Sequence, residues 1–244
     1  MVTFSFGDPA AYIPMIHAHG AKFGIQVTSR ESALRMLRHQ PDFLIVQGVE
    51  AGGHVQAHRS VMEGLEEVTA VVGDTPVLAA GGLASGEDLA AVIQAGASGG
   101  VFGTRFVASM ESEAHLSYKR AITEATSRDT ALTNCFDGDW PQCYHRVLRN
   151  STFRTWEAAG CPIKTLAPGM GDVVATSAAG TPLPRYDDAL PRFDTVGNHE
   201  AMALYAGTSV DQISSILPAG EIVREIWNEA KSHLGDRAHL GDRD

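Results

Sequence analysis

The feature that most constrains this fold is a series of short apolar runs that end in glycine turns. Three such runs and their turns are residues 43–46 before Gln47-Gly48, residues 76–80 before Gly81-Gly82, and residues 100–102 before Gly103-Thr104. Runs of this length and composition are typical of strands buried on both faces, as in a parallel sheet. A glycine after such a strand allows the backbone to come close to a ligand, because it carries no Cβ.

Segments with helical spacing alternate with the predicted strands. The predicted strands cover 2–6, 23–27, 43–46, 76–80 and 100–102, and the predicted helices cover 10–19, 29–39, 61–72, 85–94 and 111–126. Repeated strand–helix units predict a parallel sheet with right-handed crossovers. The fold class we predict is therefore α/β, with five strand–helix units.

The pattern changes after residue 128. Residues 162–191 are rich in proline and glycine and predict extended loops, while 199–205 and 220–233 predict helices. Ser209-Val210-Asp211-Gln212 resembles a capping box at the start of another helix. We expect two parts: a parallel α/β domain over residues 1–128, and a loop-rich and helical extension over 129–244 that packs on it.

Composition excludes several classes of partner. The net charge of −10 argues against nucleic acid and anionic membrane surfaces. No apolar run is long enough to span a bilayer, and no signal segment opens the chain. Three cysteines, an odd number, favour a reduced setting, so we expect a cytoplasmic protein. The three cysteines lack metal-type spacing, and no His, Asp and Glu cluster has the spacing of a metal site.

The turn Gln47-Gly48-Val49-Glu50-Ala51-Gly52-Gly53-His54 holds the best candidate for chemistry. A histidine directly after a strand can transfer protons near neutral pH. The alternative is an ordinary strand-to-helix loop with a surface histidine. Gly81-Gly82 and Gly103-Thr104 could form a phosphate cradle from backbone N–H groups, although turn geometry alone also explains glycine there.

Together these three stretches resemble the nitronate monooxygenase family, in which a Q-G-x-E-A-G-G-H turn is followed by A-A-G-G and G-T-R-F. The resemblance continues through Tyr118-Lys119-Arg120, through residues 145–150 and through residues 200–207. It implies a (β/α)8 TIM barrel that binds FMN. Family members carry about three more strand–helix units ahead of the position of Met1, so the chain resembles strands four to eight of a partial barrel, whose open edges would favour a homo-oligomer.

The resemblance also implies roles for individual residues. His54 would be the catalytic histidine beside the flavin, and Gln47, Gly52, Gly53, Gly81, Gly82, Gly103 and Thr104 would bind the cofactor. The implied reaction is oxidation of alkyl nitronates or nitroalkanes by O₂ to a carbonyl compound and nitrite. Two alternatives stay open: a flavin-dependent enoyl-thioester reductase of the same fold, and a non-catalytic member of the family.

Other residues have weaker assignments. Arg105 either adds positive charge near the phosphate or forms a structural contact. We interpret Glu50 as a structural carboxylate or one that supports residues of the site. Ser5 stands where many family members carry histidine, which bears on substrate range. Tyr205 and Gly207 resemble a tail segment that covers the flavin in relatives, although core packing explains them equally well. Nothing around His145 in the sequence indicates chemistry.

Overall fold

The computed structural model describes residues 1–138, 140 and 143–235, and this part of the chain divides into two compact units. Unit 1 consists of Met1–Glu50, Gln56–Phe102 and the segment from Arg224 onward. Unit 2 consists of Ala51–Val55 and Gly103–Val223. Residues 103–128, which the sequence analysis assigned to the parallel α/β part, lie in unit 2. The boundary at residue 128 stays a prediction about domains.

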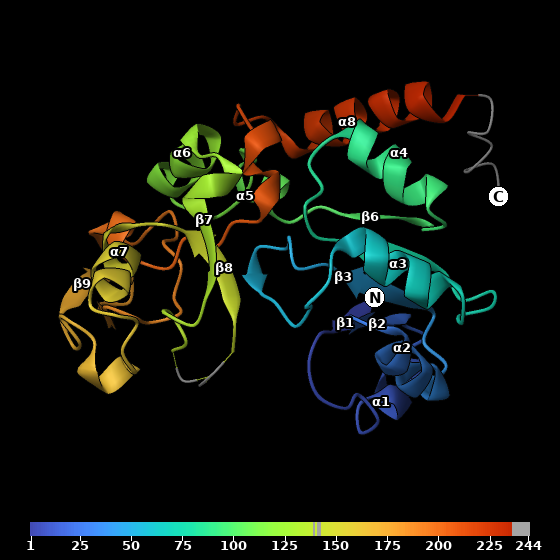
Figure 1. The fold of residues 1–244 in the computed structure, drawn as a ribbon, viewed down its shortest axis with the longest axis horizontal. Helices are drawn as coiled ribbons and strands as arrows, with labels where there is room; N and C mark the ends of the chain where they lie inside the picture. Colours follow the sequence, from blue (N-terminus) through green and yellow to red (C-terminus); the bar gives the residue numbers. More distant parts are fainter. Residues whose placement is uncertain (139, 141–142, 236–244) are drawn as a thin grey trace. The chain divides into compact units, whose positions relative to one another are not determined.

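A five-stranded parallel sheet forms the centre of unit 1 (Figure 1). Its order is β1 (Val2–Phe4), β2 (Phe23–Val27), β3 (Phe43–Gln47), β5 (Val77–Ala80) and β6 (Gly99–Val101), and every neighbouring pair is parallel. Leu44, Val46 and Ala79 have no exposed surface, as expected for strands covered on both faces. The predicted parallel α/β sheet is confirmed.

Helices follow the strands of unit 1 as the alternation predicts. They are α1 (Ile13–Ala18), α2 (Arg30–Met36) with η1 (Leu37–His39), α3 (Val61–Thr69) and α4 (Gly86–Gln94). The greater part of α8 (Ala219–Leu234), which lies outside this alternation, also belongs to unit 1. Ser85 caps α4 through a capping box with Asp88, as predicted. Equivalent boxes at Ser29 and Ser60 begin α2 and α3.

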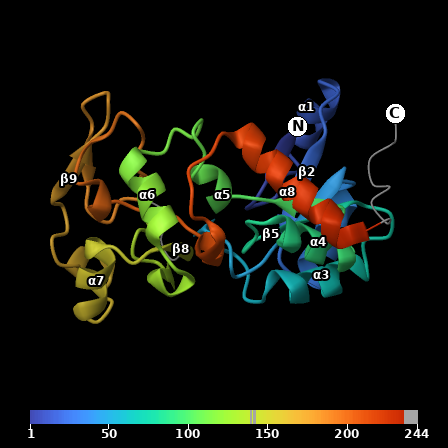
Figure 2. The same ribbon diagram turned by 90° about the horizontal axis from the view of Figure 1, so that it is seen from above.

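The last helix crosses α4 at very close range (Figure 2). A Cβ on Gly86 would lie 2.4 Å from the Ile226 carbonyl oxygen and 2.5 Å from the Ala230 nitrogen. The Gly86 N–H donates to Glu229 Oε2 at 2.6 Å. Glycine at this position therefore lets the two helix backbones touch. Within the described residues, none of the helices combines the length and the apolar character needed to cross a membrane.

Unit 2 contains two small antiparallel sheets. One has the order β4 (Gly53–His54), β8 (His145–Leu148) and β7 (Thr130–Thr133), and the other has the order β10 (Pro182–Pro184), β9 (Val173–Thr176) and β11 (Val196–Gly197). Its helices are α5 (Thr104–Val107), α6 (Leu116–Glu124) and α7 (Ser151–Ala158), with short 3-10 turns η2 (Ser127–Asp129), η3 (Lys164–Leu166), η4 (His199–Ala201) and η5 (Thr208–Gln212). An aromatic core that includes Phe136, Phe153, Trp156 and Tyr186 packs with residues of β7, β8 and α7.

Unit 2 is where the sequence-based elements differ most from the structure. Strands β7 and β8 and helix α7 were not predicted, and β9 and β10 lie in the stretch read as loops. The sequence Ser209–Gln212 lies inside η5 and does not cap a following helix, so that prediction was wrong. Asp211 instead accepts a hydrogen bond from the Ser127 N–H at 2.8 Å, which ties η5 to η2.

Candidate functional site

His54 lies on the two-residue strand β4, at the end of the glycine turn. β4 pairs with β8 in antiparallel register, so that Gly53 faces Arg146 and His54 faces His145. Three rings surround the His54 imidazole, with centroid distances of 5.1 Å to Trp140, 5.8 Å to His145 and 5.9 Å to Tyr205. The sequence motif thus places its histidine in an aromatic cluster (His54, Trp140, His145 and Tyr205).

Burial changes the acid–base properties of His54. Desolvation lowers the pKa of its imidazole below the ordinary value of 6.5, and the negative charge of Asp188 opposes this shift in part. The net direction is downward. At neutral pH the neutral form therefore predominates, which is the form that can accept a proton.

His145 is fully buried, and both of its ring nitrogens have backbone partners. Nε2 accepts a hydrogen bond from the Phe136 N–H at 3.1 Å, and Nδ1 lies 3.0 Å from the Cys143 carbonyl oxygen. Because the Phe136 amide can only donate, Nε2 carries no proton and Nδ1–H donates to Cys143. Burial lowers the pKa of His145 to about 4, so this ring is neutral over the physiological range.

Two tyrosines connect this cluster to neighbouring backbone. The Tyr118 hydroxyl donates to the Tyr205 carbonyl at 2.5 Å, and the Tyr205 hydroxyl donates to the Asp188 carbonyl at 2.9 Å. Burial raises the pKa of both phenols well above the usual value. Both therefore stay protonated and act as hydrogen-bond donors.

Each glycine of these motifs is required, or allowed, for a different physical reason. A Cβ on Gly52 would lie 2.5 Å from the Gly207 nitrogen, so the chain's own backbone requires glycine here. Gly53 has φ +75, which favours glycine, and no atom lies within 4 Å of its Cβ position. Gly103 likewise has open space at its Cβ position. Gly53 and Gly103 thus leave room for a ligand against the backbone, although open space alone does not identify a ligand site, since Gly160, Gly171 and Gly180 are equally open.

Thr104 is buried, and its hydroxyl oxygen accepts a hydrogen bond from the Gly207 N–H at 2.9 Å. Gly52, Thr104 and Gly207 therefore meet, which brings together residues that the sequence analysis singled out from three separate stretches. A hydroxyl that accepts one hydrogen bond can still donate another. Thr104 can thus hold the Gly207 segment and bond a ligand oxygen.

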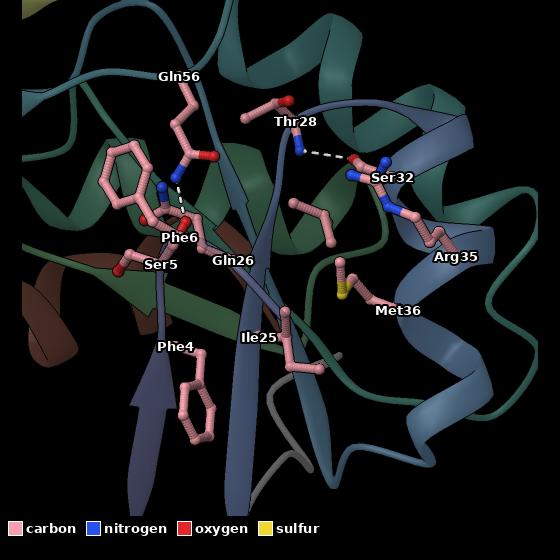
Figure 3. Close-up of a pocket in the computed structure, with 12 residues that line it drawn as sticks. Phe4, Ser5, Phe6, Ile25, Gln26, Thr28, Ser32, Arg35, Met36 and Gln56 are labelled. Atoms are coloured by element: carbon pink, nitrogen blue, oxygen red, sulfur yellow. Dashed lines mark hydrogen bonds between the residues drawn. The ribbon is translucent and has the colours of Figure 1, made fainter. Parts of the chain in front are cut away.

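In unit 1, Gln47 ends strand β3 and bonds to the chain that returns after the glycine turn. Its Oε1 accepts from the Gln56 N–H at 2.9 Å, and the Gln56 side-chain amide donates to the Ser5 carbonyl. Figure 3 shows Gln56 directed at Ser5, beside Gln26. Ser5, Gln26 and Gln56 line a cavity of about 110 Å³ at the carboxyl ends of β1 and β2.

Gln26 was not singled out from the sequence. Its Nε2 is a buried donor for which the described residues supply no acceptor. A ligand with an oxygen acceptor, such as a ring carbonyl, would satisfy this group and offset its desolvation. The signal in the sequence was one polar residue near the end of the otherwise apolar strand Phe23–Val27.

Gly81 and Gly82 follow β5 with φ values of 113 and 74, a conformation that strongly favours glycine. The Gly48 N–H bonds to the Ala80 carbonyl at 2.8 Å, so the ends of β3 and β5 stay paired up to these turns. Both Gly81 and Gly82 therefore lie at a carboxyl edge of the parallel sheet, where ligands bind in open α/β folds.

Two charged residues have structural partners. Arg105 is buried, and its Nη2 donates to the Ser215 carbonyl at 2.7 Å. Glu50 accepts from the Val61 N–H at 3.0 Å, which stabilises the start of α3. Among the residues that the structure describes, no group of three or more His, Cys, Asp or Glu could hold a metal ion.

Comparisons with known proteins agree with these motifs. Residues 1–229 match the family model described as nitronate monooxygenase. The chain is 32% identical to the nitronate monooxygenase of Pseudomonas aeruginosa, an alignment that covers 94% of this chain and 63% of that protein. The nitronate monooxygenase of Neurospora crassa is 26% identical, over 93% of this chain and 59% of its own length.

Solved structures extend the similarity to the fold. FabK from Thermotoga maritima superposes with a TM-score of 0.77 at 30% identity, over 96% of this chain and 68% of that one. Nitroalkane oxidase from Streptomyces ansochromogenes gives a TM-score of 0.70 at 28% identity, over 95% of this chain and 64% of that one. The chain spans less than two thirds of the length of the curated relatives described above. Since the family model covers nearly the whole chain, this protein belongs to the nitronate monooxygenase family, a family of oxidoreductases.

Proposed function

We propose that the chain takes part in the FMN-dependent oxidation of alkyl nitronates or nitroalkanes by O₂, which yields a carbonyl compound and nitrite. The observation that carries this proposal is His54, a half-buried imidazole of lowered pKa at the end of the family's glycine turn. The nitronate monooxygenase of Pseudomonas aeruginosa and the nitroalkane oxidase of Streptomyces ansochromogenes support the substrate class by their names.

The cofactor assignment follows the sequence motifs and is made for each unit separately. In unit 1 we assign Gln47, Gly81 and Gly82 to FMN contacts. In unit 2 we assign Gly52, Gly53, Gly103 and Thr104. In unit 2, the open Cβ positions at Gly53 and Gly103 fit a ligand that approaches backbone closely. In unit 1, the buried donor of Gln26 fits a ligand that offers an oxygen acceptor.

The chain's own residues would handle the proton. A bound flavin supplies the redox chemistry. Neutral His54 would accept the proton from the carbon next to the nitro group, which leaves an anionic nitronate beside an imidazolium. The opposite charges would then hold the anion in place. The rings around His54 limit the access of water, which favours the neutral imidazole before the substrate binds.

The test compares His54→Ala with wild type and with His199→Gln, a histidine variant of unit 2 outside the aromatic cluster. We expect His54→Ala to keep FMN binding but to lower turnover by about 10²–10⁴-fold, the usual contribution of a positioned acid–base group. Nitrite release and O₂ consumption measure turnover, and absorbance after gel filtration measures bound flavin. Equal turnover in His54→Ala and wild type would remove His54 from the mechanism.

The similarity to FabK supports a second candidate, reduction of an enoyl thioester with a nicotinamide donor. The same preparation tests it: NADH-dependent loss of the enoyl double bond, without nitrite from any nitronate, would favour the reductase. No flavin after reconstitution would favour a non-catalytic member. Three expectations stay predictions: the partial barrel, the homo-oligomer and the cytoplasmic location. Light scattering can check the homo-oligomer.

A further inference from the structure

The function proposed above gives no role to His145, yet this histidine faces His54 across the β4–β8 pair. Its ring lies 5.8 Å from the His54 ring at an interplanar angle of 76°, an edge-on arrangement. Its side chain has no exposed surface. A buried imidazole beside a candidate catalytic imidazole requires an explanation, because burying a polar ring is costly unless its nitrogens are bonded.

We propose that His145 is a positioning residue for His54, whose ring it holds in one orientation from the neighbouring strand. The inference rests on the proposed role of His54 as the base. It assigns His145 no contact with substrate or cofactor. Its contribution acts entirely through the geometry and the environment of the His54 ring.

The His145 ring is itself fixed on every side. Its two nitrogens bond to backbone of the segment that leads into β8, at Phe136 and Cys143. The Tyr205 ring packs on it edge-on at 5.9 Å, and the Phe136 ring lies at 6.2 Å. A ring held by two hydrogen bonds and two aromatic contacts has one orientation, so it offers His54 a rigid surface.

The protonation state of His145 also affects His54. Because Nε2 must accept from the Phe136 N–H, protonation of His145 would break that hydrogen bond. The ring therefore stays neutral at neutral pH and adds no positive charge beside His54. Of the described groups around His54, Asp188 acts to raise the pKa of the imidazole, and Tyr205 stays protonated because burial raises its pKa.

Two variants separate the ring from its hydrogen bonds. His145→Phe keeps an aromatic ring but loses both hydrogen bonds, whereas His145→Gln keeps a polar partner for the backbone but loses the ring. We expect the midpoint of the His54 titration, followed by NMR in flavin-free protein, to rise toward 6.5 in His145→Gln and to stay below 6.5 in His145→Phe. Water that reaches the vacated space would relieve the desolvation of His54.

Turnover provides the second readout. In His145→Gln the acid limb of the pH profile of kcat/KM should move to higher pH, with a loss of up to about fourfold at pH 6 for a midpoint that rises to 6.5, while His145→Phe should retain most of the activity at that pH. His199→Gln is the control in both assays. An unchanged His54 midpoint and an unchanged pH profile in His145→Gln would overturn the proposal.

A measurement on wild type covers the case in which a variant fails to fold. Long-range ¹H–¹⁵N spectra should show His145 as the Nδ1–H tautomer from pH 5 to 8, with nuclear Overhauser effects to the His54 ring. Titration of His145 near pH 6.5, or no contact between the two rings, would refute the positioning role. Because these spectra need no flavin, their failure is distinct from failure of the proposed oxidation.

Discussion

Gly52 offers the clearest test of why this turn carries two glycines. In Gly52→Ala the new Cβ would lie 2.5 Å from the Gly207 nitrogen and 2.7 Å from the Ala206 carbonyl carbon. Both neighbours are backbone, so a change of rotamer cannot relieve the contact. The required shift of backbone costs about 1–3 kcal/mol, and loss of the bond from the Gly207 N–H to Thr104 would add about 1–3 kcal/mol.

We therefore expect Gly52→Ala to lower the free energy of unfolding by about 2–6 kcal/mol, equivalent to a fall in Tm of roughly 4–24 °C for a chain of this size. Urea unfolding of flavin-free protein, followed by tryptophan fluorescence, measures this change. The matched control is Gly103→Ala, because no atom lies within 4 Å of that Cβ position and φ is −90.

Gly103→Ala should change stability by less than about 0.5 kcal/mol. If Gly103 contacts FMN, the same variant should weaken flavin binding, measured by quenching of flavin fluorescence. The two variants thus separate a glycine required by the chain from a glycine required by a ligand. Equal stability of Gly52→Ala and wild type would refute the reasoning about the Gly207 contact.

Two further predictions concern buried polar groups. The pKa of His145 falls from 6.5 in the unfolded chain to about 4 in the fold, so the unfolded chain binds the proton first as pH falls. The contribution of His145 to the free energy of unfolding is therefore fully present above pH 6.5 and falls by up to about 3 kcal/mol toward pH 4. Urea unfolding midpoints at pH 7 and pH 4.5 measure this loss. A smaller loss in wild type than in His145→Gln would contradict the prediction. Gln26→Leu removes a buried donor, so it should leave the flavin-free chain as stable as wild type or up to about 1 kcal/mol more stable, yet weaken FMN binding. Destabilisation with unchanged FMN affinity would show that Gln26 serves the fold alone.

The sequence was a good guide wherever local signals decide the structure. Strand Phe43–Gln47 is a continuous apolar run, and the box between Ser85 and Asp88 satisfies the first amides of α4 with neighbouring residues. These elements need no information from distant parts of the chain. Helix α7 also had a local signal in the sequence, since Asn150 caps it and Phe153 and Trp156 share its buried face.

The strands of unit 2 had no comparable signal. Strand β8 is His145–Leu148, which carries an arginine and alternates poorly, and β4 has two residues. Their pairing joins the glycine turn to a segment much later in the chain. Tertiary contacts decide whether such short segments become strands, so propensity and periodicity cannot reveal them.

The same long-range pairing explains what was predicted of the candidate site and what was not. The motif identified His54 because its neighbours in sequence are distinctive, but the motif says nothing about the rings that surround it. Trp140, His145 and Tyr205 come from other segments, and they meet His54 through the β4–β8 pair and the contacts of the Tyr205 segment. The acid–base behaviour of His54 depends on this enclosure, because burial is the largest cause of its lowered pKa. The identity of the candidate base is thus local information, whereas its protonation state is a property of the fold.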